Sequence, residues 1–331
     1  MTAPKRTRRA RSILFIEIIL IIAALFIAAI VYMSGKMKRI TWKDSDIYMN
    51  DVNDDNMSGY TNIALFGVDS RENELTKKTR SDSIIIASIN NKTHDVKLVS
   101  IYRDTFVYIP KHGYTKLNHA YAYGGPRLAI ETINRNFDMN ITDFITINFS
   151  GLTDVIDALG GVTIRIKKDE LKYVNRYAKD VANINKKEWS EIEAPGEQLL
   201  TGVQATGYSR VRYTKGGDFR RTNRQRTVIN AILDKAKHSG PVKLTKAANA
   251  VLPQTYTSLD GMEFARLSLY LPFYDIEEQT GFPFNCTPKK INGADVIVCN
   301  TYVSNVTELH QYLFGTDNYK PSDTVGSLKQ H

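Results

Sequence analysis

An apolar run near the N-terminus constrains this chain more than any other feature. It extends from Ile13 to Met33 and has Glu17 as its only charged residue. A helix of this length spans about 30 Å, the hydrocarbon thickness of a bilayer. A cleaved signal peptide would have a shorter apolar core, and a buried helix of a soluble protein would show an amphipathic stripe. Residues 13–33 are therefore predicted to form one transmembrane helix.

Basic residues on both sides of this run predict its orientation. Five Lys or Arg residues lie between Lys5 and Arg11, and three follow the run between Lys36 and Arg39. The excess before the run favours a cytoplasmic N-terminus. We therefore expect residues 1–12 to be a cytoplasmic tail and the chain after residue 33 to lie outside the cytoplasm, in a single-pass protein of the cell membrane.

Positive charge is concentrated in the same region. The chain has a net charge of +9, and residues 1–40 hold eight of its Lys and Arg residues against a single Glu. The remainder is close to neutral, whereas a protein that binds nucleic acid through its phosphates needs a basic surface. We predict no nucleic-acid partner.

The exported part reads as one domain between two polar segments. Residues 34–60 are polar and acidic and predict a stalk, and residues 319–331 predict a polar C-terminal tail. Between them, residues 61–318 alternate short apolar runs with amphipathic helical patterns and contain no clear linker. This order predicts an α/β domain whose sheet has helices packed on its faces.

Three predicted strands bring charged residues to one edge of the sheet. Asp69 follows the first strand, Arg80 and Asp82 open the second, and Arg103 and Asp104 follow the third. If neighbouring strands pair antiparallel, the end of one lies about 5 Å from the start of the next. Carboxylates suit Mg²⁺ and guanidinium groups suit phosphate, so the edge predicts a metal and phosphate site. The alternative is a set of ordinary surface ion pairs.

A basic stretch, "SRVRYTKGGDFRRTNRQR", predicts a second wall for this site. Arg210 and Arg212 are two residues apart and would face the same way in an extended segment. Asp218 can cap a helix that starts near Phe219. That helix would carry Arg221, Arg224 and Gln225 on one face. Arginines at a helix N-terminus oppose its dipole, which favours a bound anion over a solvated basic helix end.

Two further features stay open. Lys116 in "YTKLNHAY" could reach a phosphate or be an ordinary surface lysine. Cys286 and Cys299 lack the spacing of a zinc site, and outside the cytoplasm they form either a disulfide or two separate thiols.

Seven ordered motifs make the exported part resemble the LytR–CpsA–Psr family of cell-wall glycopolymer transferases. They are "GVDSR", "RSDSIIIASIN", "VSIYRDT", "KLNHAYAYGG", "VIDALGGV", "SRVRY" and "DFRRTNRQ". The resemblance implies an α-β-α sandwich with a mixed central sheet and a hydrophobic channel for a polyprenyl tail. The sequence departs from the family's usual residues at Tyr102, Thr206 and Arg220.

The resemblance also implies a function outside a Gram-positive cell. A glycopolymer, such as teichoic acid, capsule or another wall glycan, would pass from a polyprenyl-diphosphate carrier to peptidoglycan. Asp69 and Asp82 would hold Mg²⁺ or Mn²⁺. The diphosphate-binding set would be Arg80, Arg103, Lys116, Arg210, Arg212, Arg221, Arg224 and Gln225.

Catalysis would be a phosphoryl transfer that depends mainly on electrostatics and positioning. We expect Arg103 to stabilise charge and Asp82 or Asp104 to act as general base. Two alternatives remain: a non-catalytic binding or scaffold protein for the same lipid-linked glycan, and a diphosphatase that uses water as acceptor.

Overall fold

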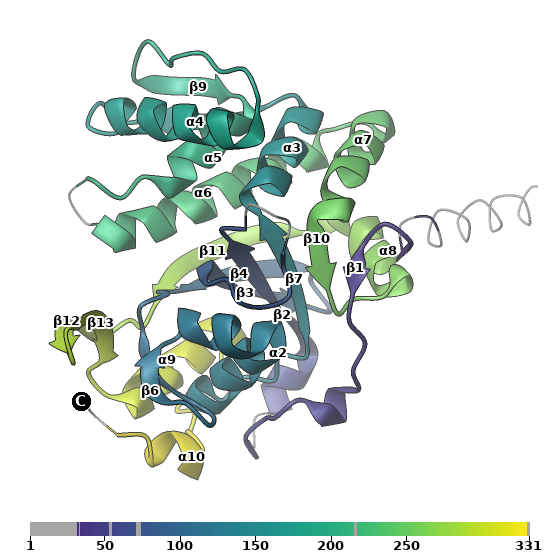
Figure 1. Cartoon of the computed structure of the whole chain (residues 1–331). Coiled ribbons are helices and arrows are strands. Elements are labelled where there is room, and N and C mark those ends of the chain that lie inside the picture. The colour runs from purple at the N-terminus through teal and green to yellow at the C-terminus, as the bar shows by residue number, and fades with distance from the viewer. Residues whose placement is uncertain (1–31, 33, 53–54, 71–73, 215–216, 330–331) are drawn as a thin grey trace, which may run out of the picture.

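The computed structural model describes residues 32, 34–52, 55–70, 74–214 and 217–329 (Figure 1). The predicted cytoplasmic tail and, apart from Tyr32, the predicted membrane span lie outside these residues. Within the described ranges, no helix is long and apolar enough to cross a membrane.

A seven-stranded mixed sheet forms the centre of the domain. Its order is β1-β10-β7-β2-β3-β4-β11. The strands are β1 (Lys38–Arg39), β2 (Tyr60–Val68), β3 (Ser81–Asn90), β4 (Asp95–Ile101), β7 (Asp143–Asn148), β10 (Thr255–Thr257) and β11 (Asp275–Phe282). The pairs β2/β3 and β3/β4 are antiparallel, and β2/β7 is parallel. The antiparallel pairing on which the predicted charged edge depends is therefore confirmed.

Helices cover both faces of this sheet (Figure 1). On one face lie α2 (Asn118–Phe137), α9 (Tyr302–Phe314) and α10 (Asp323–Gly326). On the other lie α3 (Phe149–Leu159), α6 (Gly217–Lys237), α7 (Pro241–Val251) and α8 (Gly261–Leu269). The predicted α/β fold with helices on both faces of a mixed sheet is confirmed.

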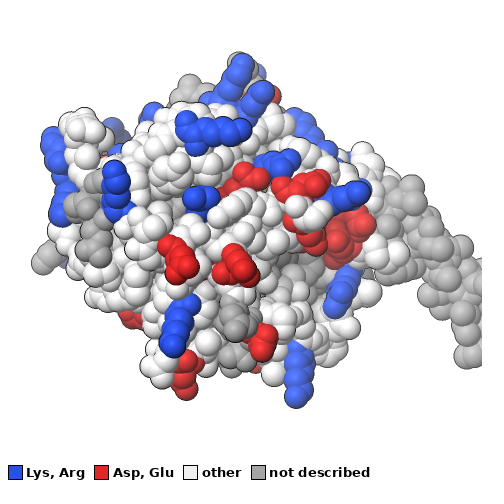
Figure 2. Space-filling model, turned by 90° about the horizontal axis from the view of Figure 1, so that it is seen from below, with Lys and Arg blue, Asp and Glu red and all other residues white. Residues whose placement is uncertain are grey.

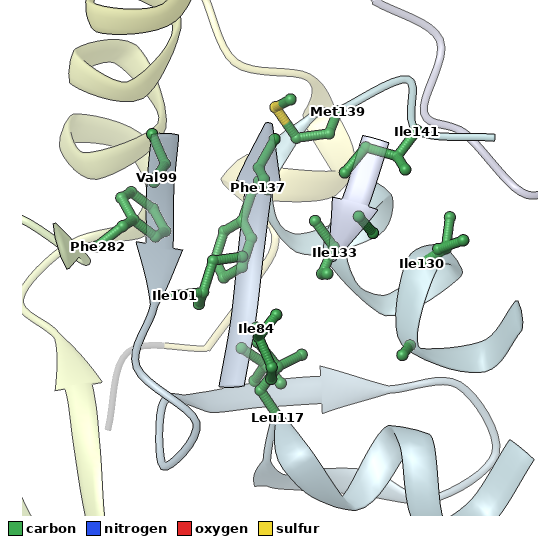
Figure 3. Packing of buried hydrophobic residues seen from close by; sticks show 14 of the residues in the cluster. Ile84, Val99, Ile101, Leu117, Ile130, Ile133, Phe137, Met139, Ile141 and Phe282 are labelled. Carbon is green, nitrogen blue, oxygen red and sulfur yellow. The ribbon is translucent and has the colours of Figure 1, made fainter. Parts of the chain in front are cut away.

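The alternation of apolar residues in β3 explains why both faces are covered. Ile84 and Ile86 pack into the core beneath α2 and α9, whereas Ile85 and Ile89 belong to the opposite core. A strand that is apolar on both faces must be buried on both. In the larger core, Phe137 packs edge-on against Phe282 with ring centroids 4.8 Å apart (Figure 3).

A smaller lobe stands beside the sheet. It contains β8 (Val162–Ile166), β9 (Gly196–Leu200), α4 (Leu171–Asn185) and α5 (Gly202–Arg210). Although β8 follows the β7–α3 unit, it pairs only with β9 instead of joining the central sheet. Gly207 lets α5 approach α4 closely, because a Cβ at this position would lie 2.5 Å from the backbone nitrogen of Ala178.

Within the described ranges, two hairpins and four short 3₁₀ helices complete the fold. The hairpins are β5 (Phe106–Ile109) with β6 (Gly113–Lys116), and β12 (Cys286–Ile291) with β13 (Ala294–Cys299). The 3₁₀ helices are η1 (Asp44–Asp46), η2 (Asp55–Gly59), η3 (Leu252–Gln254) and η4 (Leu271–Phe273).

Residues 34–60 do not form the stalk that their polarity predicts. β1 pairs with β10, and the Trp42 ring stacks on Phe144 at a centroid distance of 5.4 Å. Ile47 and Met57 are buried in the main core. Three widely spaced apolar side chains thus attach this segment to the domain, which begins before residue 61.

The predicted C-terminal tail also packs on the domain. Asp138 is fully buried and accepts hydrogen bonds from the side chains of Asn50, Tyr319 and Ser322. One buried carboxylate therefore joins the segments that flank the domain at both ends, and the folded part continues beyond residue 318.

Candidate functional site

The antiparallel strands bring three of the predicted residues to one edge. Asp69 follows β2, Asp82 lies at the start of β3, and Arg103 follows β4. The Arg103 guanidinium contacts Asp82 directly, and its Nε lies 3.8 Å from both Asp104 Oδ2 and Asp218 Oδ1. Burial lowers the pKa of Arg103, but these three carboxylates outweigh it and leave the pKa raised. The residue is held as a cation at the centre of the cluster.

A charged cavity of about 250 Å³ opens beside this edge. It is lined by Asp69, Asp82, Phe149, Tyr177, Arg210, Arg212, Arg221 and Gln225. Each of its two carboxylates faces an arginine, because Arg210 lies 3.6 Å from Asp69 and Arg212 lies 3.5 Å from Asp82. Six of the eleven predicted site residues therefore line one cavity.

The arginines reach the cavity from two elements. Arg210 is the last residue of α5, so the predicted extended conformation is wrong at this position. Its guanidinium lies over the Phe149 ring, 4.7 Å from the centroid. Arg212 follows two residues later, outside the helix. Arg221 and Gln225 lie one turn apart in the first half of α6 and point the same way.

Arg221 is a buried arginine with unused hydrogen-bond donors beside the charged cavity. Its side chain is only 2% exposed, and its Nη2 binds Asp218 Oδ1 at 2.7 Å. Its Nε and Nη1 have no hydrogen-bond partner. Burial lowers the pKa of Arg221 to about 10 in spite of Asp218. A buried guanidinium with two unused donors is costly, and an anion in the cavity would satisfy it.

Five predicted residues do not line this cavity, and two of them, Arg103 and Asp104, belong to the cluster at the strand edge beside it. Arg80 is exposed in the loop before β3. Lys116 is paired with Asp104, with 3.1 Å between Nζ and Oδ1. Arg224 is buried against Glu170, its Nη2 lying 2.9 Å from Oε1.

Arg220, which departs from the family pattern, shares this glutamate. Its Nη2 lies 3.2 Å from Glu170 Oε1, and its Nη1 lies 2.8 Å from Asp169 Oδ2. Arg224 also donates to the backbone oxygen of Val211 at 2.9 Å. Both arginines therefore attach the start of α6 to the turn after β8, and Arg224 also holds the segment that carries Arg212.

Tyr102 also connects the two walls of the site. Its ring packs edge-on against Phe219 of α6 at a centroid distance of 4.5 Å, and its backbone nitrogen donates to Phe282 of β11. The residue before Arg103 therefore contacts both the first turn of α6 and the neighbouring strand. At the third departure, Thr206 contacts Thr153 through their hydroxyl groups at 3.0 Å.

An apolar cavity of about 260 Å³ adjoins the charged one. It lies between the sheet and the helices α3, α6, α7 and α8, and Phe149 and Gln225 line both cavities. Its walls include Leu65, Ile85, Ile145, Leu152, Val228, Ile229, Leu252 and Phe264. The arrangement can hold a ligand with an anionic head and an apolar tail.

An open groove lies beside Asp104 and Asp218, two carboxylates that face Arg103. It has a volume of about 400 Å³ and is lined by Asp104, Gly217, Asp218 and Phe219 on one side and by Pro288, Asp295, Val296 and Ile297 of the β12–β13 hairpin on the other. Its carboxylates can accept hydrogen bonds from hydroxyl groups.

Two carboxylates of the charged cavity are candidate ligands for a metal ion. Among the described residues, no group of three or more His, Cys, Asp or Glu side chains has the geometry of a metal site. Asp69 and Asp82 nevertheless line one cavity. Mg²⁺ commonly uses one or two protein carboxylates and completes its shell with phosphate and water, so these two residues fit such an ion.

One face of the molecule carries charges of both signs (Figure 2). Lys and Arg side chains are interspersed there with Asp and Glu and form no continuous basic area.

Comparison with known proteins places the chain among relatives of one family. The model of the LytR_cpsA_psr family matches residues 28–309. The polyisoprenyl-teichoic acid–peptidoglycan teichoic acid transferase TagT of Bacillus subtilis is 34% identical over 177 residues, which are 53% of this chain and 52% of the relative. The chain thus spans about half the length of this relative.

Two solved structures share the fold. TagT bound to LI-WTA has a TM-score of 0.61 at 25% identity, over 80% of this chain and 94% of the other. YwtF (TagT) with bound octaprenyl pyrophosphate lipid has a TM-score of 0.58 at 24% identity, over the same shares of both chains.

Proposed function

This chain belongs to the LytR_cpsA_psr family, and on that premise we propose that it is a glycopolymer phosphotransferase. It would transfer a wall glycan from a polyprenyl-diphosphate carrier to a hydroxyl group of peptidoglycan. The observation that carries this proposal is the junction of a charged and an apolar cavity at Phe149 and Gln225. Its relative TagT is named as a polyisoprenyl-teichoic acid–peptidoglycan transferase.

The two cavities divide the donor between them. The diphosphate lies in the charged cavity, where Arg221 contributes two unused N–H donors and Arg210 and Arg212 can turn from their carboxylate partners. The polyprenyl tail lies in the apolar cavity, where water is displaced from aliphatic and aromatic side chains. Gln225 stands at the boundary between head and tail.

Mg²⁺ or Mn²⁺, held by Asp69 and Asp82, would neutralise part of the diphosphate charge. The chain's own cations act on the same charge. Arg103, Arg212 and Arg221 surround the cavity edge and stabilise the polyprenyl phosphate as it leaves. Guanidinium groups suit this role because they stay charged and bind phosphate oxygens in pairs.

The acceptor reaches phosphorus from the open groove. Arg103 faces both Asp82, which lines the charged cavity, and Asp104, which lines the groove. Each carboxylate faces two cations, Asp82 facing Arg103 and Arg212 and Asp104 facing Arg103 and Lys116. Asp104, however, lines the groove through which an incoming hydroxyl would pass. Asp104 is therefore the proposed base that removes the hydroxyl proton.

Residues 13–33 remain the proposed membrane anchor of a single-pass protein whose domain lies outside the cell. Contacts at the first described residues support this arrangement. Tyr32 and Lys36 both donate to Asn249 of α7 at 3.1 Å. The same helix contributes Val251 to the apolar cavity, so the chain enters the domain beside the place assigned to the lipid tail.

The proposal is tested by incubating the full chain in lipid nanodiscs with a labelled lipid-linked glycan, peptidoglycan oligomers and Mg²⁺. Labelled glycan should become bound to the oligomers. Arg103→Ala should lower turnover by about 100- to 1,000-fold, because removing one preformed electrostatic contact to the transition state has this effect. Arg165→Ala, at an exposed arginine of β8, is the matched control and should leave turnover unchanged.

Other products would identify the alternatives. Tight binding without any turnover would favour a scaffold protein, and release of free phosphoglycan in the presence of acceptor would favour a diphosphatase. Full activity of Arg103→Ala would contradict the role given to this residue.

A further inference from the structure

The β12–β13 hairpin brings the two cysteines of the chain face to face. Its strands are antiparallel, and the register pairs Cys286 with Cys299. The turn between the strands is Asn292–Gly293, whose φ angles are 48° and 78°. Positive φ at both positions is typical of the two-residue turn that fixes hairpin register.

The hydrogen-bond alternation defines what kind of pair the cysteines form. A two-residue turn is closed by a hydrogen-bonded pair, here Ile291 and Ala294, so every second pair along the hairpin lacks backbone bonds between the strands. Pro288 opposite Ile297 is such a pair, which suits a residue without an N–H. Cys286 opposite Cys299 is the next one.

Two hydrogen bonds outside the ladder agree with this alternation. The backbone nitrogen of Ile297 points away from β12 and donates to the backbone oxygen of Asp104 at 2.9 Å. The backbone nitrogen of Asn300 donates to the backbone oxygen of Asn285 at 2.9 Å. These two residues are the next pair beyond the cysteines, and they are hydrogen-bonded. The cysteines therefore occupy a non-hydrogen-bonded pair, in which side chains are closest.

In such a pair the Cα atoms are about 4.5 Å apart, within the range of roughly 4.4–6.8 Å that disulfides span. Both side chains also point to the same face of the hairpin. We propose that Cys286 and Cys299 form a disulfide in the exported protein. The sequence leaves open whether these residues form a disulfide or two separate thiols, and this inference favours the disulfide. It rests on the proposed location of the domain outside the cytoplasm and not on its proposed enzymatic activity.

The reaction requires an oxidant, which is the disulfide of a thiol–disulfide oxidoreductase. Both are free thiols here, with Cys299 buried and Cys286 partly accessible, and burial raises the pKa of each. Uncatalysed attack is slow because the thiolate is the nucleophile. The Cys286 thiolate attacks the disulfide of a thiol–disulfide oxidoreductase and releases one of its thiolates. Cys299 then loses its proton and attacks the mixed disulfide, which leaves the oxidoreductase as a reduced dithiol.

The disulfide would stabilise one wall of the groove. Pro288 and Ile297, the next non-hydrogen-bonded pair, line the groove together with Asp104. Because Ile297 is bonded to the Asp104 backbone, a covalent link across the hairpin restricts the backbone that follows Arg103. The bond closes only a short loop, so its effect is local.

The test measures the oxidation state of the two cysteines in the full chain. Cells that produce it are quenched in acid, and unfolded protein is alkylated with a mass-labelled maleimide before or after reduction. The chain should gain no label before reduction and two labels after it, and peptide mass spectrometry should find Cys286 linked to Cys299. Cys286→Ser and Cys299→Ser should each take one label without reduction.

Protection of the domain from a protease on the cytoplasmic side of the membrane shows that it lies outside the cytoplasm. Two labels before reduction on a domain with this location would overturn the proposal. The effect on the groove is measured separately by hydrogen exchange on purified protein. Oxidation by at least one equivalent of the disulfide form of the oxidoreductase should slow exchange at the Ile297 amide on the order of tenfold. An unchanged rate would refute the restriction of this wall while leaving the linkage itself intact.

Discussion

Two arginines of α6 with equal burial have opposite surroundings. Arg221 and Arg224 are both 2% exposed. Arg221 leaves Nε and Nη1 unpartnered beside the charged cavity, whereas the guanidinium of Arg224 is bound by Glu170, Val211 and Thr214. In the sequence both arginines belong to the single motif "DFRRTNRQ", which does not distinguish between them. Only the position of Glu170, which lies far away along the chain, separates a ligand-binding arginine from one that holds the fold.

Arg221→Met is expected to weaken ligand binding without weakening the fold. Hydrogen bonds to charged groups contribute about 1.5–3 kcal/mol each, so losing two should lower the affinity for diphosphate by about 100-fold or more. Removing a charge that is buried and incompletely paired should leave the free energy of unfolding unchanged or raised. Calorimetric titration with inorganic diphosphate and thermal unfolding measure the two effects, and unchanged affinity would contradict the role of Arg221.

At the scale of elements, the site depends on where α6 begins. Its first half carries Arg221 and Gln225 into the cavity, and Arg220 and Arg224 fasten it to Glu170 after β8. The smaller lobe thus positions the wall that faces the sheet edge. Strands β2, β3 and β4 supply the opposite wall through their register alone.

Arg224→Met is the counterpart of Arg221→Met and tests how α6 is attached to Glu170. Breaking a buried ion pair by removing one partner costs about 3–5 kcal/mol, and the remaining contact of Glu170 with Arg220 places this variant near the lower figure. Hydrogen exchange should increase in the first turns of α6 and at Val211. A variant as stable as the wild type would show that the Glu170 contacts do not hold the helix.

The two walls differ in how far the sequence predicts them. The strand ends are predictable because apolar runs and turn residues mark β2, β3 and β4 locally. The helix α5 was not predicted because it is buried all round, from Gly202 to Ser209, and has no amphipathic stripe. Arg210 was therefore assigned to an extended segment, although the structure places it in the same cavity.

At the scale of the whole molecule, the folded domain extends further in both directions along the chain than the sequence predicts. The segment before residue 61 and the one after residue 318 are polar on average, and their few buried side chains follow no period. Asp138 binds both segments through Asn50 and Ser322, which are far apart in the sequence. Contacts of this kind have no local signal, so composition alone predicts a stalk and a tail.

The central claim concerns the whole site: two adjoining cavities bind one amphiphilic diphosphate. Soluble isoprenoid diphosphates of two, three and four isoprene units test it most directly, by calorimetric titration against the full chain with inorganic diphosphate as reference. Affinity should rise by at least about tenfold per added unit, since each buried CH₂ contributes about 0.8 kcal/mol.

Ile229→Trp, which fills the apolar cavity from α6, should abolish this dependence on length and leave the affinity for inorganic diphosphate unchanged. An affinity that is the same for every chain length in the wild type would contradict the claim that the two cavities form one binding site.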